Sequence, residues 1–304
     1  MFRAAYALAR KYTFPVVISR KTVAGKCSGT IGAFIVVNDE GWFVTCYHIV
    51  KTIADLQAAE QHARAIENQV ATINKDTSLS NSERKRRLAA VPRLQSSDTD
   101  RMSVFWGVKP NVQINVKEGF FDSAVDLAIG KFDPFDSTWV AAYPEFKDPS
   151  KAFEPGASVC KLGYPFHTIV PQWDASNNRF IFPLGSVPVP LFPIEGILTR
   201  FANVVVTPQT GGVPPAQTIP WKMLETSTPG LRGQSGGPVF DSEGAIWGIQ
   251  SQTVNYPLGF NPPVPNSSKG EKVPQFLNVG RAIHAESVIA FLKQHGVKFA
   301  MSKH

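Results

Sequence analysis

The stretch Gly233-Gln234-Ser235-Gly236-Gly237-Pro238-Val239-Phe240 carries the strongest chemical signal in the chain. Glycines on both sides of Ser235 let the backbone turn tightly, so that the serine hydroxyl is exposed and nearby N–H groups converge on one point. The N–H groups of Gly233 and Ser235 are the two that would stabilise the oxyanion of an acyl-transfer intermediate. The alternative interpretation is a glycine-rich turn that only connects two strands.

A serine hydroxyl is a weak nucleophile and needs a general base within hydrogen-bond reach. His48 is the candidate base, because residues 42–46 have the pattern of a hairpin strand that ends just before it. A histidine that is merely part of the core or the surface is the alternative. The remaining histidines lie in helical, loop or terminal segments: His62, His167, His284, His295 and His304.

A histidine base needs an acid that fixes its tautomer and stabilises the imidazolium. Asp126 stands at the head of the apolar run Leu127-Ala128-Ile129, where a carboxylate is costly to bury unless it has a partner. Asp122 is the rival candidate, but it lies among loop-like residues and no apolar strand follows it directly. The sequence therefore favours Asp126 as the residue that orients His48.

The composition is that of a soluble globular protein, with 43% hydrophobic and 18% charged residues among 304. No apolar run approaches the roughly 20 residues that a membrane span needs. The 24 prolines and 23 glycines favour an all-β body with many turns. A linker-like stretch at residues 133–155 predicts two units, 1–135 with His48 and Asp126, and 136–304 with Ser235.

Residues 51–92 interrupt this β pattern. A capping box, Ser80-x-x-Glu83, opens a second short helix that should end before Pro92, so the segment is expected to form an inserted helical hairpin. A further helix is expected at about residues 284–295, and proline-rich loops at residues 183–193, 213–220 and 257–274. The first helix of the hairpin is predicted from apolar residues at steps of three and four: Leu56, Ala59, Ala63, Ile66, Val70 and Ile73.

The net charge of +7 comes mainly from the N-terminal segment, where six basic residues precede Asp39. Such a segment suits a mitochondrial presequence or a nucleic-acid arm, but a solvated first strand with its lead-in is favoured. The cysteines, Cys27, Cys46 and Cys160, are odd in number and lack metal-ligand spacing. Free thiols suit a reducing compartment, so the protein is expected to be cytoplasmic, without a metal or cofactor.

The three segments, in the order His, Asp, Ser, resemble those of the chymotrypsin/trypsin-like serine proteases, and within them the disulfide-poor bacterial-type branch that includes the HtrA/Deg enzymes. Residues 28–35 look like the family's first-barrel strand, and residues 162–165 and 244–251 like second-barrel strands. The resemblance covers nearly the whole chain. It implies two six-stranded antiparallel β-barrels with a catalytic cleft between them, and a serine endopeptidase that works through an acyl-enzyme.

Two departures from the family are informative. Ile49 stands where animal members have a half-cystine, and Gln234 where zymogen-type members have an aspartate that pairs with a new N-terminal amine. Activation by N-terminal trimming is therefore not expected. The resemblance also implies a substrate pocket without charge, which predicts neutral residues rather than Lys or Arg before the cleaved bond. Its expected lining is Pro229, six positions before the nucleophile, with Gln250, Ser251, Gln252 and Thr253 from the strand after it.

Two other function classes remain to be separated from a peptidase that acts on polypeptides. One is a catalytically silent relative that binds a peptide or partner, and the intact set of Ser235, His48 and Asp126 argues against it. The other is a nucleic-acid or membrane-surface binder, which only the basic N-terminus favours. The helical insertion is expected to regulate access to the site or to dock a regulatory protein partner, the alternative being a surface decoration.

Overall fold

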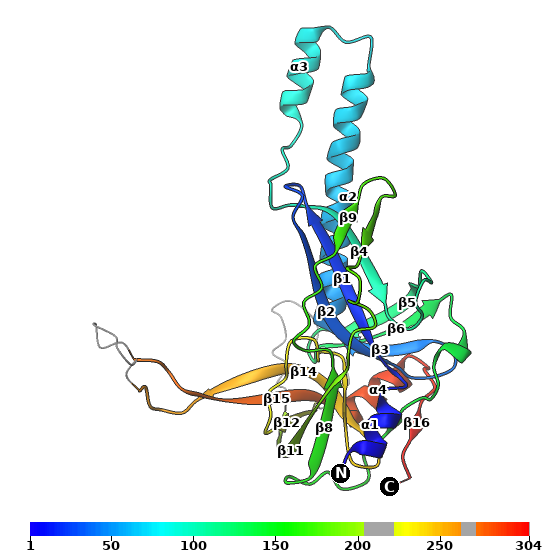
Figure 1. The fold of residues 1–304 in the computed structure, drawn as a ribbon, viewed down its shortest axis with the longest axis vertical. Helices are drawn as coiled ribbons and strands as arrows, with labels where there is room; N and C mark the ends of the chain where they lie inside the picture. The colour runs from blue at the N-terminus through cyan, green and yellow to red at the C-terminus, as the bar shows by residue number, and fades with distance from the viewer. Residues whose placement is uncertain (204–221, 263–271, 304) are drawn as a thin grey trace, which may run out of the picture.

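The computed structural model describes residues 1–203, 222–262 and 272–303, and it consists mainly of two antiparallel sheets with four helices around them (Figure 1). The loop predicted at residues 213–220 lies outside the described residues, as does part of the one predicted at 257–274. Within the described ranges, no helix is both long and apolar enough to cross a membrane.

The first sheet has six strands in the order β4-β1-β2-β3-β6-β5. It packs around an aromatic core in which the rings of Phe43 and Phe132 stack with centroids 4.3 Å apart. A Cβ at Gly130 would lie 2.6 Å from Phe43, so only glycine lets the ring reach this position. The strand bounds are β1 (Thr13–Thr22), β2 (Cys27–Val36), β3 (Trp42–Cys46), β4 (Thr99–Trp106), β5 (Asn115–Asp122) and β6 (Leu127–Asp133).

The second sheet has a closed six-stranded part in the order β13-β8-β11-β12-β15-β14, which the pairing of β13 with β14 completes. Both six-stranded units of the expected double barrel are thus present, and the second one is closed. The bounds are β8 (Ser158–Gly163), β11 (Phe192–Asn203), β12 (Lys222–Thr226), β13 (Pro238–Phe240), β14 (Ile246–Pro257) and β15 (Phe276–His284). Short strands β7 (Glu145–Phe146) and β16 (Ala300–Met301) extend it, and β9 (Gln172–Asp174) pairs with β10 (Arg179–Ile181).

The inserted helical hairpin is confirmed, and it projects from the body as helices α2 (Tyr47–Lys75) and α3 (Asn81–Ala90) (Figure 1). Only Ala63 and Ile66 of the predicted apolar stripe are buried, where α2 packs against β4. Half of the predicted capping box forms, since the Glu83 N–H donates to Ser80 Oγ at 3.2 Å. The Glu83 carboxylate instead accepts from Arg87 at 2.9 Å.

Two features of the chain differ from the sequence prediction. The basic segment that leads into β1 contains a short helix that was not predicted, α1 (Arg3–Ala9), in which Ala5 and Ala9 are buried. The inserted helix begins at Tyr47, so His48 lies in the first turn of α2 and not at the end of a strand. The reason is that β3 runs into α2 without a loop.

The predicted C-terminal helix is confirmed as α4 (Ala285–Gln294), and His284 is its N-cap. The imidazole Nδ1 accepts the Glu286 N–H at 3.0 Å, and the ring packs on Phe153 with centroids 4.4 Å apart. Burial, with a smaller contribution from Lys222, lowers the pKa of His284 from 6.5 to about 4, although Glu286 opposes the shift. The imidazole is therefore neutral in the folded protein.

We expect His284 to make the fold less stable as the pH falls from 6.5 towards 4. The unfolded chain binds a proton at His284 in this window while the folded chain does not, so protonation favours unfolding. The measurement is urea unfolding at pH 7, 6 and 5, compared with His284→Asn, which keeps a capping side chain but does not titrate. The wild type should lose stability relative to this variant as the pH falls, and parallel curves would contradict the assignment. His284→Ala should lose about 1 kcal/mol at pH 7 through the missing cap.

Candidate active site

Ser235 lies where the two sheets meet. Its carbonyl accepts the Ala33 N–H of β2 at 2.8 Å, and the next N–H, that of Gly236, donates to Gln250 O of β14 at 2.8 Å. A Cβ at Gly236 would lie 2.0 Å from Ala33 O and 2.4 Å from Thr45 Oγ1. Atoms of the first sheet therefore lie in contact with the backbone of residue 236, and only glycine can occupy this position.

The turn itself has the conformation that its glycines suggested. Gly233 and Gly236 have φ angles of +93° and +85°, a region that L residues rarely adopt. The N–H groups of Gly233 and Ser235 have no hydrogen-bond acceptor among the residues that the structure describes, whereas the Gly237 N–H is bonded to Gln234 O at 2.9 Å. The two N–H groups predicted to hold an oxyanion are thus free to receive one.

His48 and Asp126 are joined by a paired contact. The imidazole Nδ1 lies 2.8 Å from Asp126 Oδ2 and 3.1 Å from Oδ1, and the His48 N–H donates to Oδ1 at 2.8 Å. Because an ionised carboxylate only accepts, Nδ1 carries the proton and Nε2 keeps its lone pair. Asp122, the rival acid, accepts the Ala124 N–H at 2.8 Å within its own turn.

Asp126 is held in an unusual backbone conformation, with φ at +59°. Its carbonyl accepts the Tyr47 N–H at 2.9 Å, which ties this strained residue to the first turn of α2. Partial burial would raise the pKa of Asp126, but hydrogen bonds from His48 and Ser251 outweigh burial and hold the pKa below its ordinary value. The carboxylate is therefore ionised at neutral pH and can accept all of these hydrogen bonds.

Ser251 is a site residue whose contact sequence reasoning missed. It was expected to line a substrate pocket, but its Oγ donates to Asp126 Oδ2 at 2.5 Å. Its carbonyl accepts the Ser235 hydroxyl at 3.1 Å. In this structure the Ser235 hydroxyl is thus directed at Ser251, and no hydrogen bond joins it to His48 within the described ranges. Nothing in the local sequence of β14 signals a contact with a carboxylate more than a hundred positions away.

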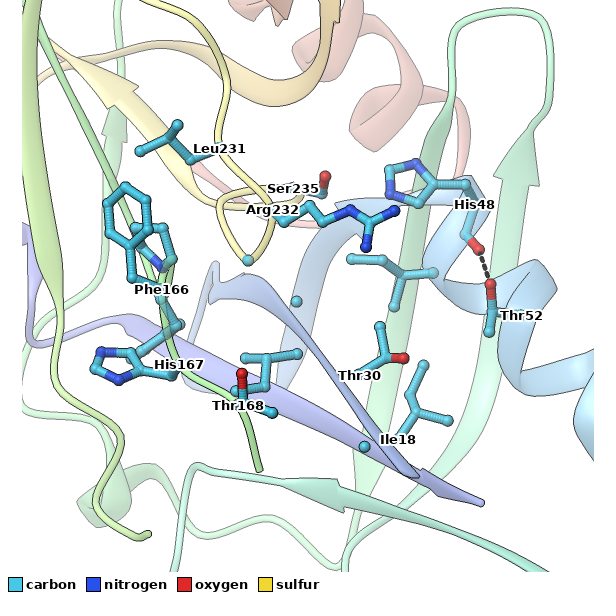
Figure 2. A pocket seen from close by; sticks show the side chains of 17 residues that line it. Ile18, Thr30, His48, Thr52, Phe166, His167, Thr168, Leu231, Arg232 and Ser235 are labelled. Atoms are coloured by element: carbon cyan, nitrogen blue, oxygen red, sulfur yellow. Dashed lines mark hydrogen bonds between the residues drawn. The ribbon is translucent and has the colours of Figure 1, made fainter. Parts of the chain in front are cut away.

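Ser235 and His48 line the same cavity, which has a volume of about 810 Å³. Figure 2 shows the His48 ring and the Ser235 hydroxyl together at one side of it, with the side chains of Phe166 and His167 on the opposite side. No acidic residue lines the cavity, while Arg232 and His167 do. Phe166 has φ at +63° and is 75% exposed. The open space beside Ser235 is thus lined by apolar and uncharged polar side chains together with the cationic side chain of Arg232.

The side chains predicted as a substrate pocket, those of Pro229, Gln250, Ser251 and Thr253, do not line this cavity. The Gln250 amide donates to Gln252 O and Arg281 O, both at 3.0 Å, and it occupies the space beside Gly230, where a Cβ would lie 2.2 Å from it. The Thr253 hydroxyl donates to Gly230 O. These groups fill the space between β14 and the segment before Ser235.

Lys161 is a second residue that the sequence analysis missed. It is fully buried in β8, and its Nζ donates to Thr228 O at 2.5 Å, Pro229 O at 2.8 Å and Thr226 Oγ1 at 3.2 Å. Burial lowers the pKa of Lys161 to about 7. The available signal was a lysine in the middle of an apolar strand, between Cys160 and Leu162, where a charge needs a partner.

The described residues contain one group with the spacing of a metal site, Cys46, His48 and Asp126, whose ligand atoms lie within 4.8 Å of one another. The Cys46 thiol donates to Gln250 O at 3.2 Å. Burial, and next to it the charge of Asp126, raises the pKa of Cys46 well above its ordinary value, so the sulfur stays protonated. A thiol is a poor metal ligand, and the donor set does not fit a metal.

Comparison with solved structures finds similarity at low sequence identity. The protease Rv3671c from M. tuberculosis, in its active form, is 14% identical with a TM-score of 0.46, over 98% of this chain and 86% of that one. The HtrA-type protease AlgW with a tripeptide is 14% identical with a TM-score of 0.44, over 98% of this chain and 65% of that one. Likeness at this distance carries no argument about activity.

Comparison of sequences is more informative. No curated protein matches the chain. The model of the trypsin-like peptidase domain, however, matches residues 29–249, a range that begins in β2, ends in β14 and includes His48, Asp126 and Ser235. Because this match covers most of the chain, including strands of both sheets, the protein belongs to the family of trypsin-like peptidases.

Proposed function

We propose that this protein is a serine endopeptidase that hydrolyses peptide bonds of polypeptides through an acyl-enzyme. Ser235 is the nucleophile, His48 the general base and Asp126 the residue that orients the base. The observation that carries the proposal is the paired contact of His48 Nδ1 with Asp126, which leaves Nε2 as an acceptor on the cavity that Ser235 also lines. This is the arrangement that activates a serine hydroxyl.

The reaction begins with rotation of the Ser235 hydroxyl from Ser251 O towards His48 Nε2. Oγ attacks the carbonyl carbon of the substrate while its proton passes to Nε2, and the N–H groups of Gly233 and Ser235 receive the oxyanion. The imidazolium, stabilised by Asp126, then gives the proton to the leaving amine. Water attacks the resulting ester with His48 again as base, and the carboxylic acid leaves.

The hydroxyl of Ser251 assists by donating a hydrogen bond that lowers the pKa of Asp126, while Asp126 keeps its contact with His48. Gln234 assists from inside the turn, since its Oε1 accepts the Leu231 N–H at 2.9 Å and fixes the chain ahead of Gly233. Both contacts hold the reacting groups in place before substrate arrives, and such preorganisation is the main source of transition-state stabilisation in sites of this kind.

The proposal also covers the division of the chain into units, its location in the cell and the role of the helical hairpin. The chain is proposed to have two units. The first, residues 1–135, contributes His48 and Asp126, and the second, residues 136–304, contributes Ser235. A cytoplasmic location is supported by the three free cysteines, Cys27, Cys46 and Cys160. The hairpin of α2 and α3 is proposed as the site of a regulatory protein partner, because it projects from the body and its first turn contains His48.

A catalytically silent binding module is the second candidate. Two observations favour it. The Ser235 hydroxyl is bonded to Ser251 O, and the Gln250 amide fills the space beside Gly230. The Ser235 hydroxyl can rotate about a single bond, however, so its contact with Ser251 O is compatible with a resting enzyme. The two candidates differ in whether Ser235 becomes acylated.

Substitution of the proposed triad should remove activity. Ser235→Ala and His48→Ala are expected to lower kcat on the order of 10⁶-fold, because members of a triad act as a unit. Asp126→Asn should cost about 10⁴-fold by favouring the wrong tautomer of His48. The measurements are hydrolysis of labelled casein and covalent labelling of the wild type by a fluorophosphonate probe.

Matched controls for these variants are His62→Ala, on the exposed face of the same helix, and Asp122→Asn, four residues before Asp126. Both should keep wild-type rates and wild-type labelling. More than a tenth of the normal rate in His48→Ala would remove His48 from the mechanism. A wild type that binds casein but is never labelled at Ser235 would favour the silent module.

Cleavage preference tests the proposed pocket. If Gln250 swings aside, the opening is walled by Pro229, Ser251 and Thr253, which bring hydrogen-bonding groups and no charge. Small or medium neutral residues should therefore precede the cleaved bond, because a buried substrate cation would have no acid to pair with it. Profiling against a peptide library measures this preference. Dominant cleavage after Arg or Lys would show that the pocket lies elsewhere.

Truncation of the hairpin tests its proposed role. Replacing residues 70–90 by a short Gly-Ser loop keeps the part of α2 that packs on β4, including Ala63 and Ile66. Hydrolysis of a small ester should be unchanged, while cleavage of a protein substrate, or its response to a partner, should change. As a control, charge reversal at Lys85 and Arg86 alters the tip without shortening it. Unchanged rates on both substrate types would identify the hairpin as a surface decoration.

A further inference from the structure

Lys161 stands out among the buried groups because the reaction described above does not use it. Its ammonium group has three N–H donors, and all three are directed at one short segment: Thr228 O, Pro229 O and Thr226 Oγ1. No carboxylate forms an ion pair with Lys161 anywhere in the described ranges. A fully buried lysine held only by neutral acceptors is costly for the fold, so a structural role alone explains it poorly.

The surroundings of Lys161 Nζ are shaped to admit it. A Cβ at Gly280 of β15 would lie 2.8 Å from Nζ and 2.7 Å from Thr228 O, so any side chain there would displace the ammonium group. The Gly280 N–H also donates to Thr228 O at 2.9 Å. One carbonyl therefore receives both a buried cation and a backbone donor, which fixes the direction of its peptide plane.

The segment that Lys161 holds leads straight to the oxyanion donors. Pro229 is four residues before Gly233, and the chain between them is fixed by several contacts, two of which involve side chains. The Thr253 hydroxyl donates to Gly230 O, and the Leu231 N–H donates to Gln234 Oε1. Backbone hydrogen bonds hold the same run as well, since the Ser227 N–H donates to Ile197 O and the Tyr164 N–H donates to Gly233 O. Lys161 adds a fully buried lysine side chain to these attachments.

We propose that Lys161 is a positioning residue for the oxyanion site, holding the Thr228 and Pro229 carbonyls so that the following chain presents the N–H groups of Gly233 and Ser235 correctly. The inference rests on the proposed serine peptidase function. It assigns Lys161 no contact with substrate and no proton transfer. Its effect is on the transition state, because the oxyanion forms only there, and a misplacement of about 1 Å can cost on the order of 10²-fold in rate.

The test uses Lys161→Met, which keeps a buried chain of similar length but removes the three donors. Labelling of the full-length protein by a fluorophosphonate is followed at several probe concentrations. In this reaction Ser235 Oγ bonds to phosphorus, fluoride leaves and the serine proton passes to His48, while the phosphoryl oxygen occupies the oxyanion site. Both kinact and kcat for a p-nitrophenyl ester should fall about 10- to 100-fold, with KI and KM within about threefold of wild type.

Lys147→Met is the matched control. Lys147 is also buried, but its ammonium group lies over the rings of Phe153 and Trp247 and does not contact the segment before Ser235. This variant should lose thermal stability with kinact unchanged. Gly280→Ala is the second test variant, since it leaves Lys161 in the sequence but crowds Nζ, and it should reproduce the loss of kinact.

The outcomes separate the two proposals. If the wild type is labelled at Ser235 and folded Lys161→Met or Gly280→Ala keeps its kinact, the positioning role is wrong while the peptidase proposal stands. The same holds if kinact falls as much in Lys147→Met. If the wild type is never labelled, the peptidase proposal fails and this inference fails with it. Loss of kinact and kcat at constant KI and KM, absent from the control, supports the role.

Discussion

The site depends on one close contact between the two sheets. The Ala33 N–H of β2 donates to Ser235 O, and the following residue, Gly236, lies against Ala33 O and Thr45 Oγ1 with no room for a Cβ. β2 pairs with β3, and β3 continues directly into α2, whose first turn contains His48. The contact at Ala33 therefore also fixes the distance between the serine turn and His48. The Tyr164 hydroxyl, bonded to Thr13 O at 2.9 Å, holds the same junction from the other side.

Most polar side chains at this junction form hydrogen bonds with one another. Asp126 receives two donors from His48 and one from Ser251, and Ser251 also accepts from Ser235. Such a chain of hydrogen bonds is stronger than isolated pairs because each bond polarises the next. Two of the buried side-chain atoms that have no partner among the described residues are the amide Nε2 of Gln234 and Oε1 of Gln250. Both belong to residues on either side of Ser235.

The sequence allowed the double-barrel class, the helical insertion and the C-terminal helix to be predicted, because hydrophobic periodicity and turn residues are local signals. It also identified Ser235, His48 and Asp126 as a set, and the structure brings these residues to one junction. The helix α1 was missed because its apolar face consists of alanines, Ala5 and Ala9, that give little periodic signal. The start of α2 was misplaced because β3 has no breaker residue after Cys46.

The residues that sequence reasoning could not place are those defined by contacts between distant segments. Ser251 was assigned to a pocket by its position after the nucleophile, but its hydroxyl is bonded to Asp126 from the other sheet. Lys161 was not considered at all, since only the fold brings β8 beneath Thr228 and Pro229. The closed space around Gln250 likewise follows from packing between β14 and the segment before Ser235, which no single stretch of sequence encodes.

The length of α2 has a mechanical consequence. Its 29 residues span about 43 Å at the usual rise of an α-helix. The helix is buried against the body at Ala63 and Ile66 and also at Ile49, in its first turn. That turn contains His48, whose backbone N–H is bonded to Asp126 Oδ1. A load on α3 therefore reaches the imidazole only through a stretch of helix that the body holds at both of its ends.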